Sequence, residues 1–118
     1  MITYTVRRTL GRVKLFRSTK DARGAAVTEI LPESAHKIVR GDGFEYGYSG
    51  TGPSQLAAAI LLDAFAKSAP AADYLAEQNF VAFKLAFLGA AVREKQEFEV
   101  TQREILRWLS NRTLAGAR

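Results

Sequence analysis

The sequence predicts an α+β domain in which a small antiparallel sheet of three to five N-terminal strands packs against two or three helices. Apolar and polar side chains alternate through residues 1–48, as they do in strands. Residues 53–112 instead carry apolar stripes at helical spacing. A chain of 118 residues buries about two-thirds of its unfolded surface, so one domain over residues 1–118 can rest on an ordinary hydrophobic core.

The first two strands are expected to form a hairpin. Apolar residues alternate with polar ones before and after the dipeptide Leu10-Gly11. A two-residue turn at this dipeptide pairs residues whose numbers sum to 21, as 10 and 11 do. The predicted pairs are Val6 with Leu15 on the inner side, and Arg7 with Lys14 and Thr5 with Phe16 on the outer side.

Further strands are expected along the N-terminal part of the chain. Residues 25–31 predict a third strand that ends at Pro32, and residues 35–40 a fourth. The aromatic segment 44–48 follows a turn at residues 41–43 and alternates like a strand, so its three rings would share one face. A short strand is also expected around Phe98, with Glu97 and Glu99 at the surface.

Two long helices and a third, well-marked helix start are expected after residue 52. Residues 53–67 are apolar around most of the helix circumference, which indicates a central helix. Residues 71–92 carry an apolar stripe wide enough for two neighbours, or for one neighbour and a partner chain. Thr101 and Glu104 have the spacing of a capping box, and the helix that they begin is expected to bury Ile105, Trp108 and Leu109.

The positive charge of the chain is concentrated near its N-terminus. The net charge is +5; residues 1–40 hold nine Lys or Arg and three acidic residues, which gives +6, and residues 41–118 hold eight and nine, which gives −1. Such asymmetry is typical of a protein that meets an acidic partner, nucleic acid included, although a basic solvated face is the simpler interpretation.

Several kinds of chemistry lack the residues they need. Without cysteine there is no disulfide, thiolate nucleophile or sulfur-based zinc site, and the single histidine, His36, is too few for a paired-histidine metal site. Asp73 and Glu77, four apart on a helix, are expected to be solvated rather than catalytic. No signal peptide or membrane span is recognised, so we expect a cytoplasmic protein with no membrane contact, cofactor, metal or catalytic residues.

The outer face of the hairpin is the first candidate for function. Like charges opposed on paired strands are destabilising, and the register places Arg7 across from Lys14. An acidic partner would relieve this repulsion, and Phe16 on the same face could stack on a base or fill a pocket. The candidate partner-binding residues are Arg7, Arg12, Lys14, Phe16, Arg17, Lys20 and Arg23.

The joint between the aromatic segment and the first helix is the second candidate. It resembles neither the dinucleotide fingerprint nor the phosphate-binding loop, because a glutamine replaces the third glycine and no Gly-Lys-Ser/Thr follows. The N–H groups of residues 54–56 could still hold one anion. The alternative is a purely architectural turn, in which the glycines supply positive φ or close packing. Glu45 is expected to pair with a nearby Arg. The candidate residues are Phe44, Glu45, Tyr46, Tyr48, Gly50, Gly52 and Gln55.

Two sequence blocks resemble a known family. The first is Phe44-Glu45-Tyr46-Gly47-Tyr48, followed by Gly50-Thr51-Gly52-Pro53-Ser54-Gln55-Leu56-Ala57, and the second runs from Phe98 to Leu109. Both are similar to the domain-of-unknown-function family numbered 6166, whose members occur in bacteria, phages and plasmids. The resemblance carries no established activity, but its setting on mobile elements implies an accessory role between phage and host.

Three function classes remain open. The first is a non-enzymatic interaction protein of phage or mobile-element type, such as an inhibitor of a host nucleic-acid-handling or defence complex, with anti-CRISPR proteins as one example. The second is a protein that binds nucleic acid directly through the basic hairpin face. An enzyme ranks last, because no nucleophile, metal set or acid–base pair is assembled. The expected partner is a protein or nucleoprotein complex of the host, and the chain is expected to be a monomer or homodimer.

Overall fold

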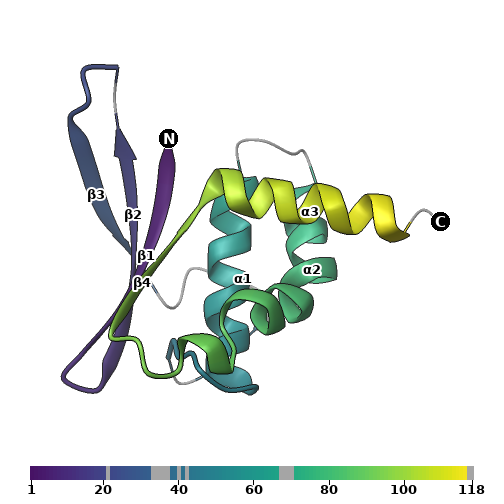
Figure 1. The fold of residues 1–118 in the computed structure, drawn as a ribbon, viewed down its shortest axis with the longest axis horizontal. Helices are drawn as coiled ribbons and strands as arrows, with labels where there is room; N and C mark the ends of the chain where they lie inside the picture. The colour runs from purple at the N-terminus through teal and green to yellow at the C-terminus, as the bar shows by residue number, and fades with distance from the viewer. Residues whose placement is uncertain (21, 33–37, 40, 42, 67–70, 117–118) are drawn as a thin grey trace.

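The computed structural model describes residues 1–20, 22–32, 38–39, 41, 43–66 and 71–116. It confirms the α+β class: a four-stranded antiparallel sheet packs against three α-helices. All of these helices lie on one side of the sheet, and no described helix covers the other side (Figure 1). The sheet therefore has an inner face toward the helices and an outer face without a helical cover.

The sheet is built around the predicted hairpin. Its strands are β1 (Ile2–Thr9), β2 (Arg12–Lys20), β3 (Ala26–Leu31) and β4 (Glu97–Thr101), in the order β3-β2-β1-β4. Leu10 and Gly11 have φ values of 53° and 76°, the left-handed conformation that a tight two-residue hairpin turn needs. The register is as predicted: Val6 pairs with Leu15, Arg7 with Lys14 and Thr5 with Phe16.

Four helical segments follow. They are α1 (Thr51–Phe65), α2 (Ala72–Phe87), the short 3₁₀ helix η2 (Ala90–Val92) and α3 (Gln102–Gly116). The prediction of one helix over residues 71–92 is wrong at its end. Gly89 is extended, with φ −87° and ψ −155°, and the carbonyl of Leu88 accepts a hydrogen bond from the Gly47 N–H at 2.7 Å. The chain therefore leaves the helical path after Phe87.

The core lies between the inner face of the sheet and α1. Tyr4, Val6 and Leu15 are fully buried on the sheet, and Leu56 and Ile60 are fully buried on α1. A helix that is apolar around most of its circumference has to be covered on most sides, and α1 is. The prediction of a central first helix is confirmed, with α2 packed beside it and α3 across its end (Figure 1).

The aromatic segment is not the strand that its alternation predicts. Residues 44–50 form no strand or helix, and Gly47 has φ +94°, which breaks the two-residue period. A Cβ on Gly47 would also lie 2.8 Å from the backbone of Arg93. Phe44 and Tyr46 are consequently buried in the core, whereas Tyr48 turns outward and is half-exposed.

The helix start at Thr101 is confirmed in detail. The Glu104 N–H donates to the Thr101 hydroxyl at 3.1 Å, and the Thr101 N–H donates to the Glu104 carboxylate at 3.2 Å. Ile105 is fully buried as predicted, but Trp108 and Leu109 are only partly buried. The Trp108 side chain lies at the edge of the core, where its ring makes T-shaped contacts with two phenylalanines of α2.

Three further predictions concern the strand over residues 35–40, the acidic pair on the second helix and membrane-spanning helices. The predicted strand over residues 35–40 and His36 lie outside the described residues, except for Ile38 and Val39, which are in no strand. Asp73 and Glu77 are exposed, as expected of a solvated pair. Over the residues that the structure places, no helix combines the length and apolarity needed to cross a membrane.

Candidate interaction site

The outer face of the sheet arranges its side chains in rows that run across the strands. The paired registers of β4, β1, β2 and β3 define them. One row is charged, the next is apolar at the end formed by β2 and β3, and the third carries only hydroxyl side chains. The rows are Glu97, Arg7 and Lys14; Glu99, Thr5, Phe16 and Ile30; and Thr101, Thr3, Ser18 and Thr28.

Three cations gather where β1 and β2 meet their turn, and we call Arg7, Arg12 and Lys14 the hairpin-end cations. Arg7 is paired with Glu97 at 2.5 Å, and its guanidinium carbon lies 4.9 Å from the centroid of the Phe16 ring. The predicted opposition of Arg7 and Lys14 is present, and β4 offsets part of it. Arg12 and Lys14 are exposed and have no ion-pair partner among the described residues.

Arg17 does not belong to this face, so its placement among the basic candidates is wrong. Being two residues beyond Leu15 on β2, it points to the inner side of the sheet. There it pairs with Glu29 at 2.5 Å and with Asp63 on α1. Asp63 also accepts a hydrogen bond from the Tyr4 hydroxyl at 2.6 Å. Arg17 is therefore a structural residue that joins the sheet to α1.

Lys20 and Arg23 lie away from the hairpin-end cations. Lys20 is the last residue of β2, six residues beyond Lys14, and a strand rises about 3.3 Å per residue, so roughly 20 Å separates their backbones. Arg23 is exposed in the turn that follows. The seven basic-face candidates thus fall into three groups. The hairpin-end cations lie near Phe16, Lys20 and Arg23 lie at the opposite end of the sheet, and Arg17 points inward.

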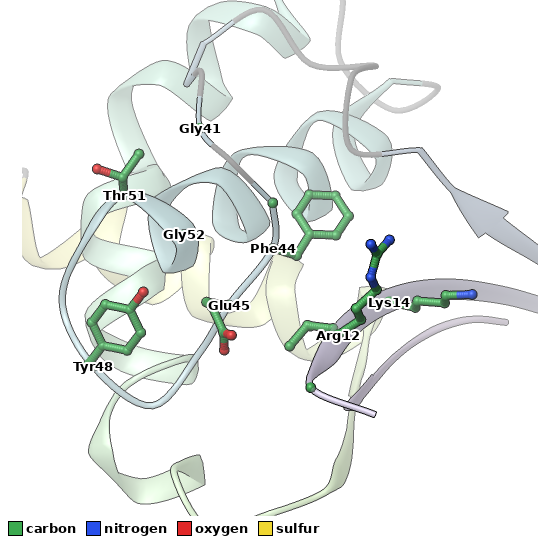
Figure 2. Close-up of a pocket in the computed structure, with 11 residues that line it drawn as sticks. Arg12, Lys14, Gly41, Phe44, Glu45, Tyr48, Thr51 and Gly52 are labelled. Carbon is green, nitrogen blue, oxygen red and sulfur yellow. The ribbon is translucent and has the colours of Figure 1, made fainter. Parts of the chain in front are cut away.

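A hollow of about 840 Å³ lies between the hairpin end and the start of α1 (Figure 2). It brings together the two candidates that the sequence analysis kept separate. Arg12 and Lys14 line one wall, and residues of the aromatic–glycine joint line the other. The lining residues that carry side chains are Arg12, Val13, Lys14, Phe44, Glu45, Tyr48 and Thr51, with Gly11, Gly41, Gly43 and Gly52 between them.

Glu45 is held by Arg8, which confirms its expected pairing with an arginine. Arg8 donates to the Glu45 carboxylate at 2.5 Å, and its guanidinium carbon lies 4.2 Å from the centroid of the Tyr46 ring. The hydrogen bond to Glu45 is the main reason that the pKa of Arg8 is raised. The charge of Glu45 is therefore largely balanced by Arg8, and Arg12 stands on the opposite wall of the hollow.

Gly50 and Gly52 are required by close packing and not by positive φ. Neither is among the residues with positive φ, which corrects that part of the prediction. A Cβ on Gly50 would lie 2.7 Å from the ring of Tyr48, and one on Gly52 would lie 2.7 Å from the Cβ of Glu45. The joint is thus architectural in a specific sense, because the two glycines make room for two residues of the hollow.

The predicted anion cradle at residues 54–56 is not open to a ligand in the way we expected. The helix begins at Thr51, so the Ser54 N–H already donates to the Gly50 carbonyl at 3.1 Å. Gln55 is buried, and its Oε1 accepts a hydrogen bond from the Gly43 N–H at 3.1 Å. The Gln55 side chain therefore holds the backbone at Gly43.

The remaining polar side chains include a buried lysine that joins two helices. Within the described ranges, no group of three or more His, Cys, Asp or Glu side chains could hold a metal ion. The buried ammonium of Lys84 donates to the Ser54 hydroxyl at 3.0 Å and links α2 to α1. What the hairpin end and the hollow can do is bind a ligand non-covalently, through cations, an exposed ring and backbone.

Sequence reasoning missed Arg8, Asp63 and Thr51. Arg8 could have been found, because the hairpin register places it on the inner side of the sheet in line with Tyr4 and Val6. Asp63 and Thr51 could not, since Asp63 contacts Arg17 across 46 residues of sequence and Thr51 lines the hollow only after the joint has packed beside the hairpin.

The comparisons with known proteins give one match. The model of a family of unknown function, DUF6166, matches residues 16–111, which is most of the chain and includes the second half of β2, the aromatic–glycine joint and the capping box. No curated protein and no solved structure matches. The protein therefore belongs to the DUF6166 family.

Proposed function

We propose that this protein is a non-enzymatic interaction protein that binds an acidic surface of a partner through the hairpin-end cations and Phe16. The observation that carries the proposal is the outer face of the sheet, which no described helix covers and on which Arg12 and Lys14 have no ion-pair partner in the described part of the chain. Exposed cations without partners steer and orient an acidic partner.

The composition of the face favours a protein partner over a phosphate backbone. Glu97 and Glu99 share the face with the cations and would repel a strand of phosphates laid across all four strands. Phe16 on β2 pairs with Ile30 on the edge strand β3, and Ile30 is exposed. Protein–protein interfaces commonly combine apolar contacts of this kind with polar and charged residues around them.

The setting of such a partner follows from the family resemblance. Because members of this family occur in bacteria, phages and plasmids, we place the partner in a host complex that handles nucleic acid or provides defence, in the manner of an anti-CRISPR protein. The basic channel that holds nucleic acid in such a host complex would repel the hairpin-end cations. The partner surface in this proposal is therefore an acidic one elsewhere on the host complex.

Direct binding of nucleic acid is the second candidate. Phe16 lies on a central strand with the Arg7 guanidinium stacked over its ring, and this pairing of an aromatic ring and a cation is typical of stacking platforms for single strands. Under this alternative, binding would fall steeply with salt, because each phosphate contact releases counterions.

The test is a tagged pull-down from a bacterial lysate with and without nuclease, followed by affinity measurements on the recovered partner. The variant is the triple substitution Arg7→Ala, Arg12→Ala and Lys14→Ala. The matched control removes three exposed cations elsewhere, by Lys95→Ala, Arg103→Ala and Arg107→Ala. The proposal expects a nuclease-resistant partner and a large loss of affinity in the first triple variant alone. Equal affinities of the two triple variants would contradict it.

A further inference from the structure

One wall of the hollow beside α1 carries an aromatic ring, that of Tyr48. Tyr48 is half-exposed, yet its ring edge lies 2.7 Å from where a Cβ on Gly50 would stand. Its hydroxyl lies 3.3 Å from the corresponding position on Gly52. The ring is therefore packed along the glycines on one side, while its other side is open to the hollow (Figure 2).

Across from Tyr48 stands a cation. Figure 2 shows Arg12 on the hairpin wall of the hollow, and Tyr48 and Glu45 on the wall that belongs to the joint. The stem of Lys14 lines the same wall as Arg12, and its ammonium points away from the joint. Arg12 has no ion pair with any described carboxylate, and a guanidinium forms strong charge-assisted hydrogen bonds with an anion.

The size of the hollow fits a small ligand. At about 840 Å³ it lies within the range of roughly 300–1,000 Å³ that is typical of small-molecule sites. Glycines contribute much of its lining, which leaves backbone open to close approach. The site therefore combines a flat ring, a planar cation and accessible backbone, with the carboxylate of Glu45 held between the two walls by Arg8.

We propose that this hollow binds a nucleoside phosphate, with the base stacked on Tyr48 and the phosphate held by Arg12. A nucleoside phosphate carries a flat ring and an anion on one molecule, which are the groups that the two walls accept. A base next to a terminal phosphate occurs both in a free nucleotide and at the phosphorylated end of a nucleic acid chain. The inference shares Arg12 with the proposed function but adds Tyr48, which is not one of the hairpin-end cations, so Tyr48→Ala tests it separately.

The experiment is isothermal titration calorimetry of the full chain with adenosine monophosphate, adenosine and inorganic phosphate. We expect the monophosphate to bind more tightly than either of its parts. A short oligonucleotide with a 5′-phosphate, compared with the same oligonucleotide without it, distinguishes the two sources. Binding of the monophosphate and the phosphorylated oligonucleotide supports a chain end, and binding of the monophosphate alone supports a free nucleotide.

Variants assign the contacts. Tyr48→Ala should weaken binding of the monophosphate by about 5- to 150-fold, whereas Tyr48→Phe keeps the ring and should retain it. Arg12→Gln should weaken binding of the monophosphate but not of adenosine. Lys20→Gln removes an exposed cation at the other end of β2 and is the control. Circular dichroism and thermal unfolding establish that each variant is folded.

Three results would overturn the inference. The first is no binding of the monophosphate at millimolar concentration. The second is inorganic phosphate binding as tightly as the monophosphate, because the ring would then have no role. The third is unchanged affinity in Tyr48→Ala. If Tyr48→Ala loses the nucleotide but still binds the acidic partner, the hollow and the proposed interaction face are separate sites.

Discussion

The hydroxyl of Tyr4 on β1 donates a hydrogen bond to the carboxylate of Asp63 on α1 at 2.6 Å, and so ties the sheet to its central helix. Arg17 pairs with the other oxygen of the same carboxylate and with Glu29 on β3. A carboxylate between a cation and a hydroxyl has its charge compensated, which allows Asp63 to lie on an otherwise apolar helix. Three strands are thereby fixed to α1 through one side chain.

This contact predicts a loss of stability in alkaline solution. Burial, followed by the hydrogen bond to Asp63, raises the pKa of Tyr4 above its ordinary value of 10.0. The folded protein therefore keeps the phenol proton at a pH where the unfolded chain loses it, and the free energy of unfolding falls as the pH rises above 10. Tyr4→Phe should cost about 1.5 kcal/mol at neutral pH and make the alkaline fall shallower.

Denaturant unfolding of both proteins between neutral pH and pH values above 10 measures this difference. Tyr74 is exposed on α2, so Tyr74→Phe is the matched control and should leave the pH dependence unchanged. Parallel curves for Tyr4→Phe and the unmodified protein would contradict the assignment.

The two close-packed glycines of the joint should respond differently to alanine. The Cβ of Gly52→Ala would meet the Cβ of Glu45, which cannot move without its backbone, so we expect a loss of about 1–3 kcal/mol. The Cβ of Gly50→Ala would meet the ring of Tyr48, which is half-exposed and can swing outward. Gly50→Ala should therefore change stability less and instead displace the ring.

Thermal unfolding gives the stability of each glycine variant, and chemical shifts of the Tyr48 ring protons report its position. Ser49→Ala, at the exposed position just before Gly50, is the control. If Gly52→Ala melts at the same temperature as the unmodified protein, the packing at Glu45 is looser than the distances indicate.

The start of α3 gives a third prediction. Thr101→Ala removes the hydroxyl that caps the Glu104 N–H and should cost about 1 kcal/mol. Trp108→Ala removes ring contacts to Phe83 and Phe87, at 5.6 and 5.8 Å between centroids, and should cost near the low end of about 3–5 kcal/mol because the indole is only partly buried. The fluorescence of this single tryptophan should shift to longer wavelength on unfolding, and an emission typical of water in the native protein would contradict the packing.

The features that the sequence predicted correctly depend on residues close together in the chain. The hairpin register followed from the turn at Leu10-Gly11 and the alternation beside it, and the capping box followed from Thr101 and Glu104. Both depend on residues a few positions apart, so neighbouring sequence carries the information. The position of β4 beside β1 could not be predicted in this way, because about 90 residues separate Arg7 from Glu97.

The wrong predictions have different causes. Residues 44–48 alternate like a strand, but the positive φ of Gly47 and its hydrogen bond to Leu88 give the segment another path. The error on Arg17 is local, because the alternation of β2 places Arg17 on the same side as Leu15, where Asp63 and Glu29 pair with it. The hollow exists only because the joint packs against the hairpin end, so no single stretch of sequence could reveal it.

The last prediction concerns the charge balance of the outer face. Glu97 pairs with Arg7 at 2.5 Å, and both side chains are about half-exposed, so the pair contributes little to stability. Glu97→Gln should change the free energy of unfolding by less than about 0.5 kcal/mol. It releases the Arg7 charge beside Lys14, and affinity for an acidic partner should therefore rise, with a steeper dependence on salt. Glu77→Gln removes an exposed charge from α2 and is the control. If the two variants bind the partner equally, the cations at the hairpin end do not form the working surface.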